Sequence, residues 1–131
     1  MNKLNRLFQF RFLIVLLLSC LVIACSQTTV LPPVFIKSEP AVDAILDRHP
    51  RTVRIFLTEL PNIPNSSLRL FGENGEVSLS RFHTMGADDL MIEIDDHPLP
   101  NGKYRVEWTA TLGDDERQYS GKYEFTVAVG G

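Results

Sequence analysis

The sequence predicts an all-β domain, an immunoglobulin-like β-sandwich of about seven strands, that follows an N-terminal export signal. Three observations support this fold class. Apolar and polar residues alternate in short runs, turn-forming residues separate those runs, and no segment of helix length has apolar residues at the 3.6-residue period. The chain has 131 residues, which suffice for one such domain and little else.

The first 24 residues have the features of a secretory signal. Lys3, Arg6 and Arg11 precede an apolar stretch over residues 12–24, and this part of the chain contains no acidic residue. A membrane-spanning helix needs about 20 apolar residues, so the stretch is too short for that role. We therefore expect residues 1–24 to be a cleaved signal peptide, and an uncleaved signal anchor is the alternative.

The end of this segment resembles a lipobox. In Val22-Ile23-Ala24-Cys25, a signal peptidase would leave Cys25 as a lipid-modified N-terminus. Acyl chains contribute roughly 0.8 kcal/mol of membrane binding per buried CH2 group, so two or three chains anchor a protein firmly. Ser26 follows rather than aspartate, which favours the outer membrane in a Gram-negative cell. We expect a lipid anchor in the cell envelope that faces the periplasm.

Removal of the signal leaves an acidic chain without free thiols. Three of the 13 basic residues lie in the signal, which leaves 10 against 16 acidic residues and a net charge of −6. This balance argues against a nucleic-acid partner, because such proteins usually carry a basic patch. Cys20 leaves with the signal and Cys25 carries lipid, so no disulfide can form in the mature chain. The hydrophobic core alone must hold the domain together.

The alternating runs define the strands in order. Residues 25–33, the lipidated cysteine and a proline-bearing tether, precede a domain expected over residues 34–131. Val53, Ile55 and Leu57 share one strand face, which we expect to lie in the core. Trp108 shares such a face with its neighbours and is also expected in the core. The seven expected strands are residues 34–37, 52–58, 67–71, 76–80, 90–94, 103–112 and 121–129.

Turn signals separate these strands. Gly72-Glu73-Asn74-Gly75 ends in Asn-Gly, whose residues tolerate positive φ, and predicts a hairpin between the third and fourth strands. Residues 98–102 contain two prolines and a glycine and are expected to form the turn before the sixth strand. Residues 41–46 are the one segment that could form a single helical turn.

Few residues carry chemistry, and the sequence does not predict an enzyme. No nucleophilic cysteine, Gly-x-Ser-x-Gly elbow or phosphate-binding glycine loop is present. His49 and His97 are expected to be solvated loop residues, and the acidic pair Asp88-Asp89 is expected to be solvated turn charge. His83 and Met85 form the one candidate soft-metal pair, because copper(I) prefers soft ligands such as a thioether.

Short motifs follow one another along the domain in a recognisable order. They are Ser38-Glu39-Pro40-Ala41, Pro50–Ile55 with Thr58-Glu59, Leu70–Gly75, Leu99–Trp108, and Ser120-Gly121 with Phe125-Thr126-Val127. Their order and spacing resemble those of the CopC family, small periplasmic copper-resistance domains with an immunoglobulin-like β-sandwich. The resemblance covers residues 35–129 and implies copper binding and a role in copper homeostasis.

The copper ligands that the resemblance implies are only partly present. The family's N-terminal histidine has no counterpart, and its second histidine falls at Arg117, which is donor-only and cannot ligate a metal. Glu59 and Asp115 remain as oxygen ligands, which are expected to hold copper(II) weakly. The short turn Gly72–Gly75 stands in place of the family's methionine-rich copper(I) loop.

Two functions therefore remain open. The first is a non-enzymatic copper-homeostasis lipoprotein, with a rearranged site or with an envelope protein as partner. The alternative is a metal-free interaction or structural module, in which Arg117 pairs with Asp115 or Glu59 across the former site.

Overall fold

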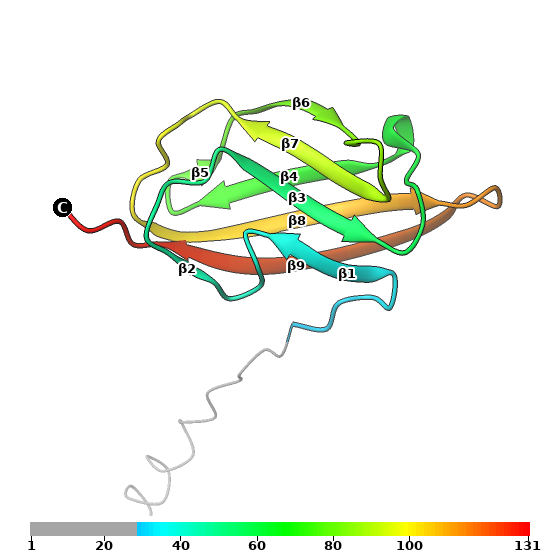
Figure 1. The fold of residues 1–131 in the computed structure, drawn as a ribbon, viewed down its shortest axis with the longest axis horizontal. Helices are drawn as coiled ribbons and strands as arrows, with labels where there is room; N and C mark the ends of the chain where they lie inside the picture. The colour runs from blue at the N-terminus through cyan, green and yellow to red at the C-terminus, as the bar shows by residue number, and fades with distance from the viewer. Residues whose placement is uncertain (1–28) are drawn as a thin grey trace, which may run out of the picture.

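The computed structural model describes residues 29–131, which form a sandwich of two β-sheets (Figure 1). The four-stranded sheet has the order β1-β3-β7-β6, with strands Phe35–Glu39, Thr52–Leu57, Asp89–Ile94 and Leu79–His83. The five-stranded sheet has the order β2-β9-β8-β4-β5, with strands Ile45–Leu46, Arg117–Val127, Gly102–Leu112, Ser67–Gly72 and Gly75–Glu76. The predicted two-sheet, immunoglobulin-like sandwich is confirmed. A short 3-10 turn, Ile63–Asn65, is the one helical element in this part of the chain.

The expected signal over residues 1–24 and the lipidation site Cys25 lie outside the described residues. Within residues 29–131, no helical segment has the length and hydropathy of a membrane span.

Six of the seven expected strands are present, with ends shifted by a few residues. The expected strand over residues 76–80 is wrong, because the chain changes sheets there. Val77 N–H still donates to Leu70 of β4, whereas the Ser78 carbonyl already accepts a hydrogen bond from Asp95, just after β7. Two short strands therefore replace the single expected strand: β5 lies in the five-stranded sheet and β6 in the four-stranded sheet. The alternation of apolar and polar residues does not reveal that the chain passes from one sheet to the other, because a strand in either sheet has the same alternation.

Two of the expected turns also differ in detail. The hairpin at Gly72–Gly75 is present, but Gly72 pairs with Gly75, so the loop residues are Glu73 and Asn74. Positive φ falls on Gly75, at +113°, and not on Asn74. Residues 41–46 form no helical turn; they end in β2, which pairs in parallel with β9.

The core lies between the sheets and consists of the inward faces of the strands. Trp108 is 2% exposed, as expected, and its indole lies over Gly121, where an added Cβ would be 2.7 Å from Cζ2. The buried apolar residues are Val53, Ile55, Leu57, Leu68, Leu70, Leu90, Ile92, Ile94, Leu99, Tyr104, Val106, Trp108, Ala110, Leu112, Tyr123, Phe125 and Val127. Because all of them and every strand that the structure describes lie after Gln27, we expect the segment 27–131 to fold on its own.

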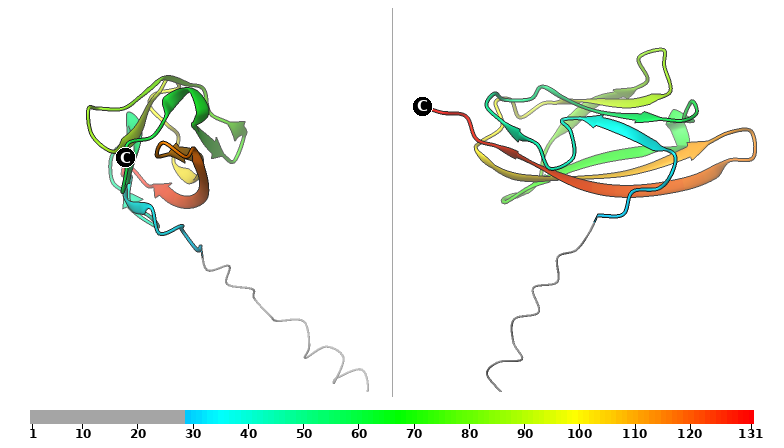
Figure 2. Two further views of the ribbon diagram at one scale, coloured as in Figure 1. Left: turned by 90° about the vertical axis from the view of Figure 1, so that its right-hand side faces the viewer. Right: turned by 60° about the horizontal axis from the view of Figure 1, so that its bottom comes forward.

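Strands β8 and β9 form the longest element of the structure. They pair without a break from Gly102–Val127 to Leu112–Arg117. The hairpin reaches past the ends of the neighbouring strands, as Figure 1 and the right-hand view of Figure 2 show. Gly113, with φ at +71°, and Glu116, with φ at +51°, bend the chain at its tip.

One carboxylate is fully buried in the four-stranded sheet, against the expectation that Asp88-Asp89 is solvated. Asp89 has 0% exposure and accepts a hydrogen bond from Arg54 Nε at 2.6 Å. Its second oxygen accepts the backbone N–H of Met85 at 3.0 Å. Burial of a charge is costly unless the charge is paired and hydrogen-bonded, and both conditions are met here.

We predict that Arg54→Leu lowers the free energy of unfolding by about 3 kcal/mol, because it leaves the Asp89 carboxylate buried without its cation. The control is Arg81→Leu, which removes the exposed ion pair with Glu93. That variant should change stability by less than about 1 kcal/mol. Urea unfolding of both variants checks the prediction, and equal losses would contradict it.

Candidate metal centre

Glu59, Asp115 and Arg117, which the resemblance to the CopC family implies lie at a copper(II) site, meet at the tip of the β8–β9 hairpin. Arg117 lies at the centre of this cluster. Its Nε donates to Asp115 Oδ1 at 2.9 Å, and its Nη2 contacts both Glu59 oxygens at 3.2 and 3.3 Å. The structure therefore brings Glu59 and Asp115 together, as the sequence led us to expect. It also contains the pairing of Arg117 that the metal-free alternative predicts.

Two further residues complete the surroundings of Arg117. Its Nη1 donates to the hydroxyl of Tyr119 at 3.1 Å. Gly113 lies against all three charged side chains, so an added Cβ would be 2.9 Å from Asp115 Oδ1 and 3.2 Å from Arg117 Nη2. Its φ of +71° is also in the left-handed region that favours glycine. Gly113 thus allows the tip to fold closely over the cluster.

The electrostatics of the cluster follow from these hydrogen bonds. Donation from Arg117 holds the pKa of Asp115 below its usual value of 3.8, and the same bond raises the pKa of Arg117. Asp115 is therefore anionic at neutral pH, and its charge is already matched. Side-chain exposures of 47% for Arg117 and Glu59 and 65% for Asp115 leave the cluster open to water, so screening weakens the ion pairs.

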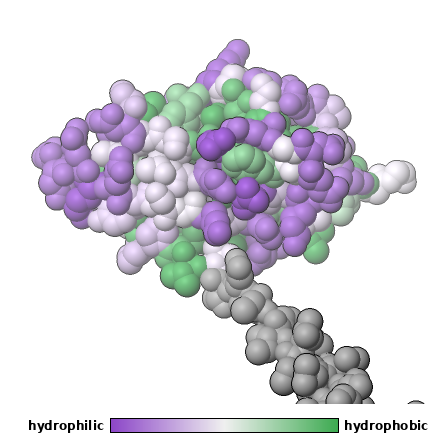
Figure 3. Space-filling model, turned by 180° about the vertical axis from the view of Figure 1, so that it is seen from behind, coloured by the Kyte–Doolittle hydropathy of each residue, from purple (hydrophilic) through white to green (hydrophobic). Residues whose placement is uncertain are grey.

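The surface around the hairpin tip is hydrophilic. Figure 3 views the molecule from behind, and the hairpin end, at the left of that view, is coated with hydrophilic residues.

His83 and Met85, the candidate soft-metal pair, lie side by side. His83 Nε2 is 3.2 Å from Met85 Sδ, and His83 Nδ1 lies within hydrogen-bond distance of the Arg81 carbonyl oxygen. Met91 is the residue directly opposite His83 in the β6–β7 pairing. Residue spacing alone does not connect Met91 with His83, although the composition points to it, because Met85 and Met91 are the only methionines after Met1.

His49 and His97, expected to be separate loop residues in solvent, are partly buried and close together. Their ring centroids are 6.3 Å apart in a T-shaped arrangement. His49 Nδ1 is 2.8 Å from the Leu99 carbonyl oxygen, whereas His97 Nδ1 is buried and has no hydrogen-bond partner among the described residues. Within residues 29–131, no three His, Cys, Asp or Glu side chains are arranged to hold a metal ion.

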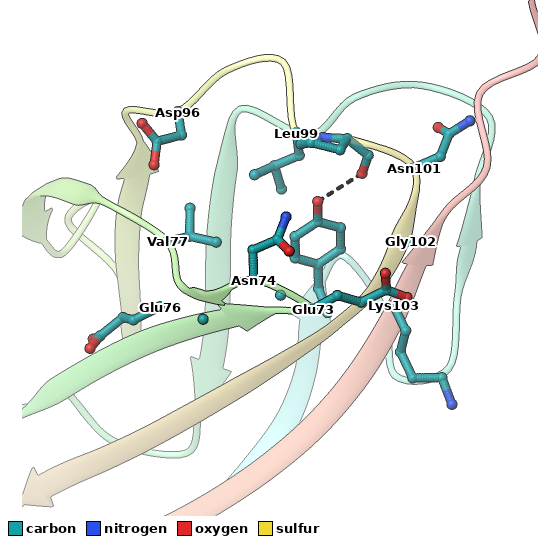
Figure 4. Close-up of a pocket in the computed structure, with 13 residues that line it drawn as sticks. Glu73, Asn74, Glu76, Val77, Asp96, Leu99, Asn101, Gly102 and Lys103 are labelled. Carbon is teal, nitrogen blue, oxygen red and sulfur yellow. Dashed lines mark hydrogen bonds between the residues drawn. The ribbon is translucent and has the colours of Figure 1, made fainter.

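A cavity of about 260 Å³ occupies the opposite end of the sandwich, beside the turn Gly72–Gly75 (Figure 4). Tyr104 is one of the residues that line it and donates its hydroxyl to the Pro100 carbonyl at 2.7 Å. Glu73 and Asp96 line separate sides of it in Figure 4. No methionine or cysteine is among the 13 residues that line the cavity, so this place offers no soft ligand.

The fold and the cluster together define a small β-sandwich domain with an acidic site at one end of its longest hairpin. The family model for the CopC domain matches residues 35–128, which is most of the chain. The chain therefore belongs to the CopC family.

Solved structures agree with this assignment. PcoC, a methionine-rich copper-resistance protein from Escherichia coli, is 25% identical and has a TM-score of 0.64; the match covers 72% of this chain and 96% of PcoC. CopC from Methylosinus trichosporium OB3b is 20% identical, with a TM-score of 0.64 over 74% of this chain and 94% of that chain, which supports the fold. No curated protein matches the chain.

The cluster predicts a measurable pH effect. In an NMR titration of side-chain carboxyls, the pKa of Asp115 should lie below 3.8 and rise towards that value in Arg117→Leu. Since the folded-state pKa is the lower one, this ion pair stabilises the fold above pH about 4, and the contribution disappears as the pH falls through the folded pKa.

The control for this titration is Arg48→Leu, an exposed arginine in the loop before β3, which should leave the Asp115 titration unchanged. An Asp115 titration that is the same with and without Arg117 would show that the hydrogen bond does not form in solution.

Proposed function

We propose that this chain is a non-enzymatic copper-homeostasis protein of the cell envelope in which Arg117 has replaced the family's tight copper(II) site. The proposal rests on one observation: the Arg117 guanidinium binds both carboxylates, Asp115 and Glu59, that remain at the site. Membership of the CopC family and the likeness to PcoC, a methionine-rich copper-resistance protein, support the connection with copper.

The chemistry of the site explains why copper(II) binding is weak. Copper(II) at Glu59 and Asp115 would meet only oxygen ligands, whereas this ion binds imidazole nitrogen well. The ion would also have to displace the guanidinium from both carboxylates or remain beside its positive charge. Each option reduces the binding free energy, and Arg117 cannot lose its proton to relieve the conflict.

A metal-free interaction module is the second candidate function. The observation that favours it is that Arg117 satisfies its two acidic neighbours and Tyr119 without any ion. In this alternative the domain acts through an envelope protein partner, and the charged cluster serves only to order the hairpin tip.

The proposal also includes the cellular location of the protein. Residues 1–24 are a cleaved signal, residues 25–33 are the lipidated cysteine and tether, and residues 34–131 are the sandwich domain. Cys25 anchors the domain in the membrane, facing the periplasm, and the outer membrane is favoured in a Gram-negative cell.

The site proposal predicts that one substitution restores copper(II) binding. The segment 27–131 should bind copper(II) with a Kd weaker than about 1 µM, and Arg117→His should tighten this by at least about tenfold, or about 1.4 kcal/mol. The imidazole would supply a nitrogen ligand between two carboxylates. Isothermal titration with copper(II) measures the change.

The matched control is Arg117→Leu, which removes the competing cation without adding a ligand. It should tighten binding less than Arg117→His does. Submicromolar copper(II) binding by the unmodified segment would refute the claim that the site has been lost.

The anchor proposal predicts that Cys25→Ser moves the protein from the membrane fraction to the soluble envelope fraction, because the acyl chains have no other attachment point. Ser26→Ala, the neighbouring substitution, should leave the protein with the membrane. Fractionation followed by immunoblotting measures both, and a Cys25→Ser protein that stays in the membrane fraction would refute the lipid anchor.

A further inference from the structure

We propose a copper(I) site formed by His83, Met85 and Met91 on the outer face of the four-stranded sheet. The site lies at the β6–β7 connection, away from the turn Gly72–Gly75 that replaces the family's methionine-rich loop. The inference deepens the proposed role in copper homeostasis and rests on it. The inference assigns copper(I) to a site whose ligands, one imidazole and two thioethers, are neutral and soft.

The distribution of methionine is the first reason. After Met1, the chain has only Met85 and Met91, and both follow the one histidine of this region, His83. Met85 is 54% exposed. The thioether is therefore available to a ligand at the surface.

A β-bulge brings the three side chains to one face. In the β6–β7 pairing, Ser80 lies opposite Glu93 and His83 lies opposite Met91, so β6 has one extra residue between these pairs. Arg81, with φ at +53°, is in the left-handed region at this irregularity. With this register, His83 shares the outer face with Met91, and directly opposite residues have Cβ atoms about 4.5–5.5 Å apart.

Hydrogen bonding prepares His83 as a ligand. Its Nδ1 lies against the Arg81 carbonyl, which can only accept a hydrogen bond, so Nδ1 carries the proton and Nε2 of the neutral ring has a free lone pair. That lone pair faces Met85 Sδ at 3.2 Å. In this tautomer two acceptors face each other, and a soft cation bound to both would satisfy them. Histidines that ligate metals are usually held by such a bond through the other ring nitrogen.

Buried Asp89 holds the loop that carries Met85. Its Oδ1 accepts the Met85 backbone N–H at 3.0 Å, and its Oδ2 is bound to Arg54. Both carboxylate oxygens of Asp89 already accept hydrogen bonds. Asp89 is thus a positioning residue and not a ligand of the proposed copper(I) ion. The thioether is consequently presented from an anchored backbone.

The surrounding charges permit a monovalent cation. Arg54, which lies opposite Met91 on β3, is paired with Asp89, and Arg81 is paired with Glu93 at 3.3 Å. Both nearby cations are thereby neutralised. A set of one imidazole and two thioethers has no charge of its own, which suits copper(I) better than the harder copper(II).

The test is a competition titration of the segment 27–131 with copper(I), under reductant and without oxygen, against a chromophoric copper(I) chelator. The unmodified segment should bind one copper(I) with a Kd tighter than about 1 µM. His83→Gln, and the double variant Met85→Leu with Met91→Leu, should each weaken binding by at least about tenfold. Leucine conserves the volume of methionine, so the fold should tolerate the double variant.

The matched control is His49→Gln combined with His97→Gln, the same substitution at the other two histidines, which should leave the copper(I) affinity unchanged. As a second readout, the Nε2 resonance of His83 should shift in 15N NMR when copper(I) is added, while the Nδ1 proton remains bound.

The outcomes separate the site from the wider function. Copper(I) binding that survives the His83 and methionine substitutions, or that is lost in the His49/His97 variant, would overturn this site and leave the copper role standing. An unmodified segment that binds neither copper(I) nor copper(II) would overturn the copper role as well and favour the interaction module.

Discussion

The unbroken pairing of β8 with β9 is the constraint on which the rest of the structure depends. Residues 29–131, which the structure describes, contain no cysteine, so the core must hold the sandwich, and this hairpin contributes Trp108, Tyr123 and Phe125 to it. A slip of one residue would turn every inward side chain to the solvent, so core packing sets the register along the whole hairpin. The same register fixes Asp115 and Arg117 at the tip, within hydrogen-bond distance of one another.

The arginine at this tip already contacts both acidic side chains of the cluster. A guanidinium carries a permanent charge and five donors, so at Arg117 it behaves as a resident cation that two carboxylates already coordinate. Membership of a family describes the fold, whereas function depends on the side chains at the site. In this chain the hard, anionic ligands are matched internally, and the neutral, soft ligands gather in another place, at the β6–β7 connection.

Stability and the proposed copper(I) site share one residue. Asp89 is buried because Arg54 neutralises it, and its second oxygen fixes the backbone of Met85. The ion pair and the loop geometry are therefore coupled, since any change that frees the carboxylate also frees the chain beside the thioether. The identities of the candidate ligands do not reveal this coupling between a buried charge and a surface loop, because Asp89 contacts the backbone N–H of Met85 and not its side chain.

The sequence by itself determined the two-layer sandwich, the presence of six of its strands, the inward face of the strand at residues 52–58 and the burial of Trp108. These follow from alternation and residue type, which are local properties. Only the tertiary structure decided that residues 76–80 divide between two sheets, that Asp89 is buried, that His49 meets His97, and that a bulge sets His83 opposite Met91. Each of these depends on which strand lies beside which and in what register, and core packing between distant segments selects that pairing.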